Sequence, residues 1–187
     1  MEIVAHALWA TAAAKAAHRK AARVGAVWLV IWTMFPDLLA FSPDVAVGLW
    51  YRLTGSAANH DFHHGGGPGW WNVDLYDLGH SLVVFLAVFL VAWALRRRPL
   101  WEMLGWALHI LLDIPSHSAH FPTPFLWPLS SYFLVGVSWR QWWFMALNYA
   151  MLAATFYFLR INRKTAQGSD ANRPRRGCGL ETSDSRF

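Results

Sequence analysis

The sequence is poor in cysteine and in charge, and both shortages narrow what the protein can be. Its single cysteine, Cys178, lies in a polar C-terminal stretch, so neither a disulfide framework nor a thiolate metal site is expected. Charged residues make up only 14% of the chain, whereas soluble domains carry about 25%. The sequence also lacks a GxSxG motif and a glycine loop of the kind that binds phosphate, which argues against a serine hydrolase elbow or a nucleotide site.

What remains is strongly apolar. Hydrophobic residues make up 56% of the 187 residues, and a soluble protein of this size could not bury that much apolar surface because its surface-to-volume ratio is too high. The chain has 13 Trp residues. Trp favours membrane interfaces, where its ring is in apolar surroundings and its N–H stays hydrated. The composition therefore predicts a protein whose main partner is a lipid bilayer.

Four apolar blocks are long enough to be membrane spans, since about 18 residues at about 1.5 Å each reach about 27 Å, close to the thickness of the hydrocarbon core. The blocks are Val24–Phe41, Leu78–Leu95, Pro99–Ser116 and Trp142–Leu159. A fifth, alanine-rich block, Ile3–Ala17, is shorter and forms either a short span or a helix in the interface. We favour the span, and predict an all-α bundle of about five transmembrane helices in a membrane-embedded domain, residues 1–164, with a long outer loop.

The basic residues indicate how such a bundle is oriented. With five alternating spans, all but two of the 16 Lys and Arg residues, Arg52 and Arg140, fall on the same side. By the positive-inside rule that side is cytoplasmic, so the N-terminus lies outside and the C-terminus inside. The pattern predicts an integral protein of the cytoplasmic (inner) membrane, with a disordered cytoplasmic tail over 165–187 and no nucleic-acid partner. The oligomeric state stays open.

Several ionisable residues of ligand type lie near the outer ends of the predicted spans. Ionisable side chains inside a membrane are costly, so they usually have a function. Helix geometry places His6 about 17 Å and Asp37 about 20 Å from the basic turn that joins their two blocks, a difference of less than one helical turn. His80, His109 and Asp113 also fall towards the outer ends of their blocks. The sequence therefore predicts that these five residues meet at one depth.

Their chemistry is that of a metal site. His109 and Asp113 are four residues apart, which places them on one helix face, and His117 continues that face. Imidazole nitrogen together with carboxylate oxygen suits a divalent metal, zinc first and also manganese or iron. A dication would offset the cost of burying Asp37 and Asp113, which we expect to be the catalytic pair, and would lower the pKa of a bound water towards about 7.

Each of these residues also has a simpler interpretation. A single His in a membrane helix is more often a hydrogen-bonding residue than a ligand, an Asp near a helix end can be a cap, and an HxxxD pair recurs by chance. Only the joint placement favours a metal. The outer loop, Ser42–Asp77, holds further candidates. His64 and the histidines beside it are as readily solvated as ligating, while Asp74 and Asp77 are placed to orient an imidazole.

Short motifs follow one another along roughly residues 1–130: His6, Pro36-Asp37, His80-Ser81 and Gly105-x-x-x-His109-x-x-x-Asp113. In this order they resemble the YdjM-like family of membrane-bound metal-dependent hydrolases. The resemblance implies hydrolysis and a metal held at the His and Asp positions of these motifs. Family members often carry a His-Arg pair shortly before the His-Ser, where this chain reads Asp74-Leu75-Tyr76-Asp77-Leu78-Gly79. One ligand of the family is therefore replaced or missing here.

The function favoured by the sequence is a membrane-bound metal-dependent hydrolase of an ester or phosphoester. A site at headgroup depth suggests a lipid or lipid-linked substrate, with a small molecule as the other option. Two further interpretations stay open. A haem protein would use paired histidines but gains nothing from Asp37 and Asp113 at the same depth. A metal-sensing or structural membrane protein without hydrolytic activity would share the same composition.

Overall fold

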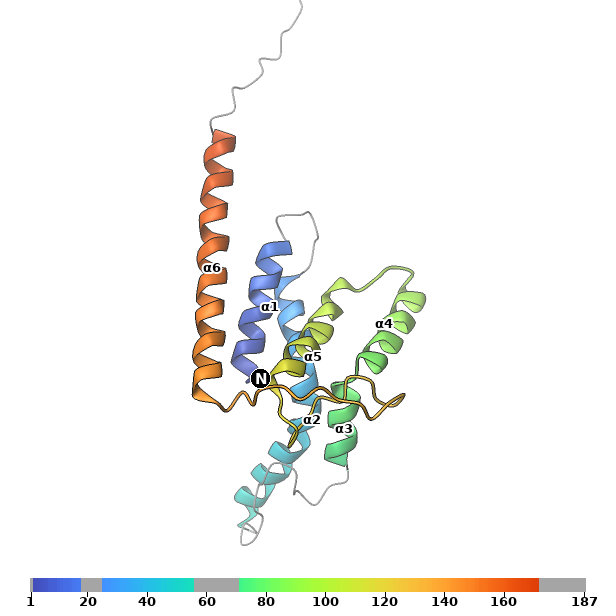
Figure 1. The fold of residues 1–187 in the computed structure, drawn as a ribbon. Coiled ribbons are helices and arrows are strands. Elements are labelled where there is room, and N and C mark those ends of the chain that lie inside the picture. The colour runs from blue at the N-terminus through green and yellow to red at the C-terminus, as the bar shows by residue number, and fades with distance from the viewer. Residues whose placement is uncertain (1, 18–24, 56–70, 172–187) are drawn as a thin grey trace, which may run out of the picture.

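The computed structural model describes residues 2–17, 25–55 and 71–171, and within these ranges every regular element is a helix (Figure 1). The elements are α1 (Ile3–Ala17), α2 (Ala26–Thr54), α3 (Trp71–Gly79), α4 (Leu82–Arg96), the 3-10 turn η3 (Trp101–Met103), α5 (Leu104–Ser116) and α6 (Trp142–Ala171). The prediction of an all-α fold is confirmed.

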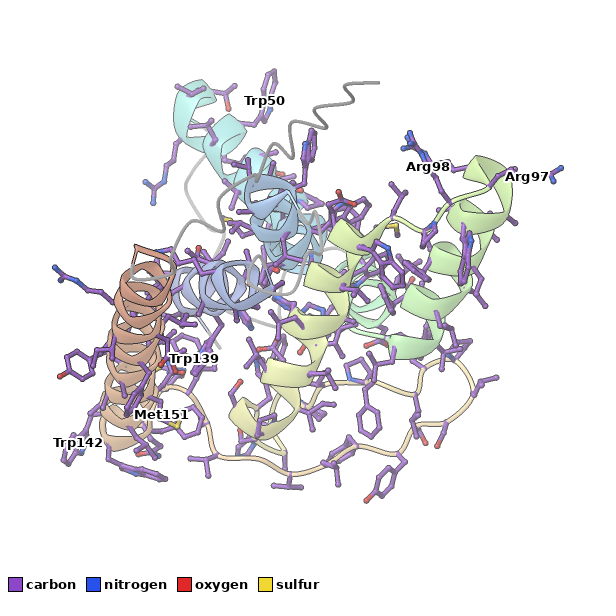
Figure 2. The ribbon with its side chains drawn as sticks, turned by 90° about the horizontal axis from the view of Figure 1, so that it is seen from above. Trp50, Arg97, Arg98, Trp139, Trp142 and Met151 are labelled. Atoms are coloured by element: carbon purple, nitrogen blue, oxygen red, sulfur yellow. The ribbon has the colours of Figure 1, made fainter. Side chains whose placement is uncertain are left out.

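The long helices alternate in direction. α1, α4 and α6 run towards one end of the molecule, whereas α2 and α5 run towards the other (Figure 1). The turn after α4 lies at the end where α6 finishes (Figure 1), and its Arg97 and Arg98 point away from the helices (Figure 2). α5 packs mainly on α2, and α1 packs on both α2 and α6. Helix α2 is therefore the central element.

Only two helices have the length and apolar composition to cross a membrane within the described ranges: α2, and the part of α6 from Trp142 to Asn162. α1 and α4 have 15 residues each and α5 has 13. At about 1.5 Å per residue these three reach about 20–22 Å, short of a hydrocarbon core of about 30 Å. Within the described ranges two helices, not five, are long enough to span. The predicted lengths of Leu78–Leu95 and Pro99–Ser116 are wrong, whereas Ile3–Ala17 has the bounds expected of the short fifth helix.

Local chemistry explains why two of the predicted spans are shorter than their apolar blocks. The block Leu78–Leu95 is broken near its start, because Ser81 caps a new helix. Its Oγ accepts hydrogen bonds from the backbone N–H groups of Val83 and Val84, both at 3.1 Å. The block Pro99–Ser116 begins with non-helical residues and η3, so α5 starts only at Leu104.

The predicted outer loop and tail are partly helical. We expected a loop from Ser42 with a short interfacial helix around Val45–Leu53, yet α2 continues without a break through Pro43 to Thr54. It ends at Gly55, whose φ of 71° is the left-handed conformation that favours glycine. Its second half extends beyond the other helices (Figure 1), and Trp50 points away from them (Figure 2). α3 also occupies part of that loop. α6 passes the predicted boundary at residue 164, and residues 172–187 lie outside the described part.

A glycine allows α5 to pack directly against the backbone of α2. A Cβ atom added at Gly105 would lie 2.2 Å from the carbonyl oxygen of Leu29 and 2.7 Å from Oγ1 of Thr33. Both helices run in the same direction at this contact (Figure 1). The residues one turn further along each helix, His109 and Asp37, are therefore brought face to face.

The irregular segment 117–141 joins α5 to α6 and passes beside α3 and the start of α4 (Figure 1). The backbone N–H of Gly136 donates to the carbonyl of His117 at 2.8 Å. Further back, the N–H of Leu82 donates to the carbonyl of Phe125 at 2.9 Å. These bonds fix the segment against the start of α4, next to His80, and against the end of α5, which carries Asp113.

We predict that Gly105→Ala destabilises the fold by about 2 kcal/mol or more, because the new methyl group overlaps a backbone oxygen that cannot move aside. Thermal unfolding of the detergent-solubilised protein, followed by circular dichroism, measures this. Leu111→Ala, at an exposed position one and a half turns further along α5, is the control and should cost about 0.5 kcal/mol or less. Equal unfolding temperatures for wild type and Gly105→Ala would refute the close contact.

Candidate metal centre

Four of the five predicted ligand residues converge on one small volume. Asp37, His80, His109 and Asp113 each offer one ligand atom, and these atoms all lie within 4.8 Å of one another. Asp37 comes from α2, His80 from the bend between α3 and α4, and the other two from α5. Three are buried, and the Asp37 side chain is 15% exposed. The predicted meeting of residues from separate helices is thus present; we call this set the four-residue cluster.

The distances inside the cluster fit a single cation. The Nε2 atoms of His80 and His109 are 3.1 Å apart. Oδ2 of Asp113 lies 3.0 Å from His109 Nε2 and 3.5 Å from His80 Nε2. Oδ1 of Asp37 lies 3.6 Å and 3.7 Å from the same two nitrogens. Ligand atoms on a tetrahedral zinc with bonds of about 2.0–2.1 Å are about 3.3–3.4 Å apart. These five spacings are close to that value, and the remaining pair, between the Asp37 and Asp113 oxygens, lies within 4.8 Å.

The orientation of His80 is set by the backbone. Its Nδ1 lies 2.9 Å from the carbonyl oxygen of Tyr76. A carbonyl can only accept, so we assign the ring hydrogen to Nδ1, and the lone pair of the neutral ring is then on Nε2. That lone pair faces oxygens of Asp37 and Asp113. Such an arrangement is favourable either with a cation between the ring and the carboxylates or with a protonated ring: burial lowers the pKa of His80, but Asp113 and Asp37 outweigh it and raise the pKa to about 9. The carbonyl is the kind of partner that orients metal-binding histidines.

His6, the fifth predicted ligand, lies against the other oxygens of the two carboxylates. Its Nε2 is 3.1 Å from Oδ1 of Asp113, and its Nδ1 is 3.9 Å from Oδ2 of Asp37. Its ring stacks on that of His109 with centroids 3.9 Å apart and 24° between the planes. The side chain is fully buried. His6 therefore lies beside both aspartates at the edge of the centre, and neither of its ring nitrogens makes a hydrogen bond within the described residues.

His117, a further candidate, lies beside the cluster. It follows α5, and its Nδ1 is 3.0 Å from the carbonyl oxygen of Asp113 and 3.6 Å from Oδ1 of the same residue. The Oγ1 of Thr123 is 3.3 Å from the same nitrogen. His117 therefore contacts Asp113 on the side that His6 also contacts, and is not one of the four converging residues.

The candidates from the predicted outer loop are not brought into the cluster. Asp74 is exposed in the first turn of α3. Asp77 is partly buried, and burial together with the charge of Asp74 raises its pKa. For His80, the orienting role expected of these two residues belongs to the carbonyl of Tyr76. His64 lies outside the described residues.

Two residues near the centre were missed by the sequence analysis. The ring of Tyr76 is buried and stacks on His80, with centroids 4.0 Å apart and 23° between the planes. Tyr76 precedes His80 by four residues, so a helical assignment there would have placed both on one face. Thr123 lies in the irregular segment 117–141, where spacing along the chain gives no information about contacts.

Comparison of the chain with protein-family models, with curated proteins and with solved structures found no match. The functional argument therefore depends on the geometry of the site. That geometry is a buried cluster of two imidazoles and two carboxylates that could bind a divalent metal. The donor set suits zinc, manganese and iron, and does not choose between them.

We predict that the purified protein binds about one divalent ion per chain, and that Asp113→Asn lowers its zinc affinity at least about 10-fold, because an amide oxygen brings no charge to the cation. Metal analysis after dialysis against a zinc buffer measures both. Asp77→Asn, on α3 outside the cluster, is the control and should keep the ion. Stoichiometric zinc in Asp113→Asn would overturn the assignment.

Proposed function

We propose that the protein is a membrane-bound metal-dependent hydrolase whose metal is held by His80, His109 and Asp113, with Asp37 completing the site. The observation that supports this most strongly is the convergence of two imidazole nitrogens on the oxygens of two buried aspartates. Two carboxylates bring two negative charges into apolar surroundings, where they are costly unless a cation compensates them. One dication has the required charge and fits the spacing.

We assign the role of general base to Asp37. It is the least buried member of the cluster, with a side chain 15% exposed, and it lies farther from the two Nε2 atoms than Asp113 does. We therefore place the entrance for water and substrate at Asp37, which is positioned to accept a proton from the attacking water. Bound at this site, a divalent ion would lower the pKa of water towards about 7 and polarise the substrate oxygen.

The membrane setting is the second part of the proposal. α2 and α6 would cross the bilayer, and the shorter α1, α4 and α5 would complete a five-helix domain over residues 1–164. Large apolar side chains cover the outsides of α4 and α6, a surface that favours lipid over water; they include Leu90, Val91, Leu95, Trp142, Tyr157 and Phe158. The shared end of α6 and the Arg97–Arg98 turn would face the cytoplasm of an inner-membrane protein.

The substrate we propose is an ester or phosphoester, small or lipid-linked. The N-terminus of α1 lies at the opposite end of the helices from the Arg97–Arg98 turn (Figure 1). In the proposed orientation this end meets the outer headgroup region, which favours a lipid. The motif order from His6 to Asp113 supports placing the chain among the YdjM-like hydrolases.

A second candidate function is metal binding without hydrolysis. Structural zinc sites are closed by four protein ligands, whereas catalytic zinc usually keeps one position for water. Four donors converge here. With Asp37 as the fourth ligand of the metal the site is closed, which favours the structural alternative. A haem is disfavoured, because its axial histidines lie on opposite faces of the porphyrin and the Nε2 atoms of His80 and His109 are only 3.1 Å apart.

We predict zinc-dependent hydrolysis of bis(p-nitrophenyl) phosphate or of short-chain phospholipids by the purified protein. Chelation should abolish it, zinc should restore it, and Asp37→Asn should lower kcat about 100-fold or more by removing the proton acceptor. Release of p-nitrophenol or of the phospholipid headgroup is the measurement, with Asp74→Asn as the unaffected control. A zinc-loaded wild type that hydrolyses no ester would support the non-hydrolytic alternative instead.

The lone cysteine provides a test of orientation. We predict that a membrane-impermeant maleimide does not label Cys178 in cells with an intact inner membrane, and labels it after lysis, because the basic end faces the cytoplasm. In a Cys178→Ser background, Thr54→Cys at the opposite end of α2 should be labelled without lysis. The reverse pattern would refute the orientation.

A further inference from the structure

The hydroxyl of Tyr76 is a buried polar group that the proposed function leaves without a role. The residue is only 8% exposed, and its hydroxyl oxygen makes no hydrogen bond within the described part of the chain. Buried polar groups in native proteins are nearly always bonded, so one that is not requires an explanation. Phenylalanine would fill the same space without the cost of a desolvated hydroxyl.

The surroundings of Tyr76 tie it to the metal centre. Its ring stacks on one face of His80 and contacts Phe121, with ring centroids 4.5 Å apart in the second pair. Its own carbonyl orients His80 through Nδ1. Contacts on two sides hold the Tyr76 ring in place. Its position therefore depends on that of His80, which is a proposed ligand of the metal.

The phenol of Tyr76 is neutral at pH 7, since a tyrosine ordinarily has a pKa of about 10. The side chain of Thr123 lies close enough to the hydroxyl to interact with it, but the two groups do not meet hydrogen-bond geometry. A neutral phenol that has already lost its water is a hydrogen-bond donor in need of an acceptor.

We infer that the Tyr76 hydroxyl donates a hydrogen bond to a charged oxygen of the ligand that occupies the centre, and that this ligand is a phosphate group. The inference rests on the proposed function, because an anion would approach two aspartates only with a cation between them. A bond from a preorganised, desolvated donor to a charged oxygen is stronger than one between neutral groups. A phosphate offers such an oxygen whether it is free or part of a phosphoester.

The competing explanation is that Tyr76 only supports His80 by packing. The two explanations separate cleanly, because Tyr76→Phe keeps the ring, its stacking and the backbone carbonyl while removing only the hydroxyl. A packing role predicts that the Phe variant behaves as wild type. A donor role predicts that metal binding is kept and anion binding is weakened.

The experiment is a titration of inorganic phosphate into the zinc-loaded, full-length protein in detergent, followed by isothermal calorimetry. Tyr76→Phe should keep wild-type zinc stoichiometry, and its Kd for phosphate should rise roughly 10-fold, as expected for loss of one hydrogen bond to a charged group. Tyr132→Phe removes a hydroxyl from a residue that is 58% exposed, and should leave the Kd unchanged. Water-soluble dihexanoyl phosphatidic acid, titrated in parallel, identifies a lipid headgroup if it binds more tightly than phosphate, and free phosphate if it does not.

The outcomes distinguish the inference from the proposed function. A wild type without zinc would refute the metal centre itself. If wild type holds zinc and Tyr76→Phe binds phosphate equally tightly, the donor role fails and the metal centre stands. The donor role fails in the same way if zinc-loaded wild type binds no phosphate. If Tyr76→Phe loses zinc, the hydroxyl is needed to build the site, and the donor role is again refuted.

Discussion

The burial of two aspartates in one small volume is the constraint on which this structure depends. Asp37 and Asp113 come from different helices, and three histidines surround them. Neutral imidazoles supply hydrogen bonds but no charge, and a protonated His80 would offset only one of the two carboxylates, so the pair remains costly to bring together. A bound dication removes that cost and converts the repulsion into coordination. Metal binding would then stabilise the packing of α2 against α5 as well as create a reactive site.

The scaffold holds this cluster with backbone contacts at each side. Gly105 brings the backbone of α5 against α2 one turn before His109 and Asp37 meet. Ser81 begins α4 immediately after His80, so the imidazole lies at a bend whose position is fixed by a helix cap. The carbonyl of Tyr76 then sets the rotation of the ring. Gly105 and Ser81 therefore act on the same site although they are far apart in the sequence. They position the helices and the bend that carry the His and Asp side chains of the cluster.

Sequence periodicity and helix geometry were sufficient to predict the all-α fold and the convergence of the cluster. The height of a residue along a helix follows from counting, so His6 and Asp37 could be placed at one depth without coordinates. Hydropathy failed where local chemistry competes with it: the block Leu78–Leu95 is uniformly apolar after its start, yet the Ser81 cap shortens the helix. Tyr76 was missed because its segment was taken for a loop, and the contact of Thr123 with His117 depends on an irregular path that has no period.

X-ray absorption at the zinc edge tests the central claim most directly, because it reports the atoms around the ion whether or not the protein turns over a substrate. The proposed centre predicts a first shell of nitrogen and oxygen at about 2.0–2.1 Å, with the outer-shell signature of two imidazoles, which disappears in a His80→Ala, His109→Ala double variant. A zinc shell without imidazole, or an unchanged spectrum in that variant, would contradict it.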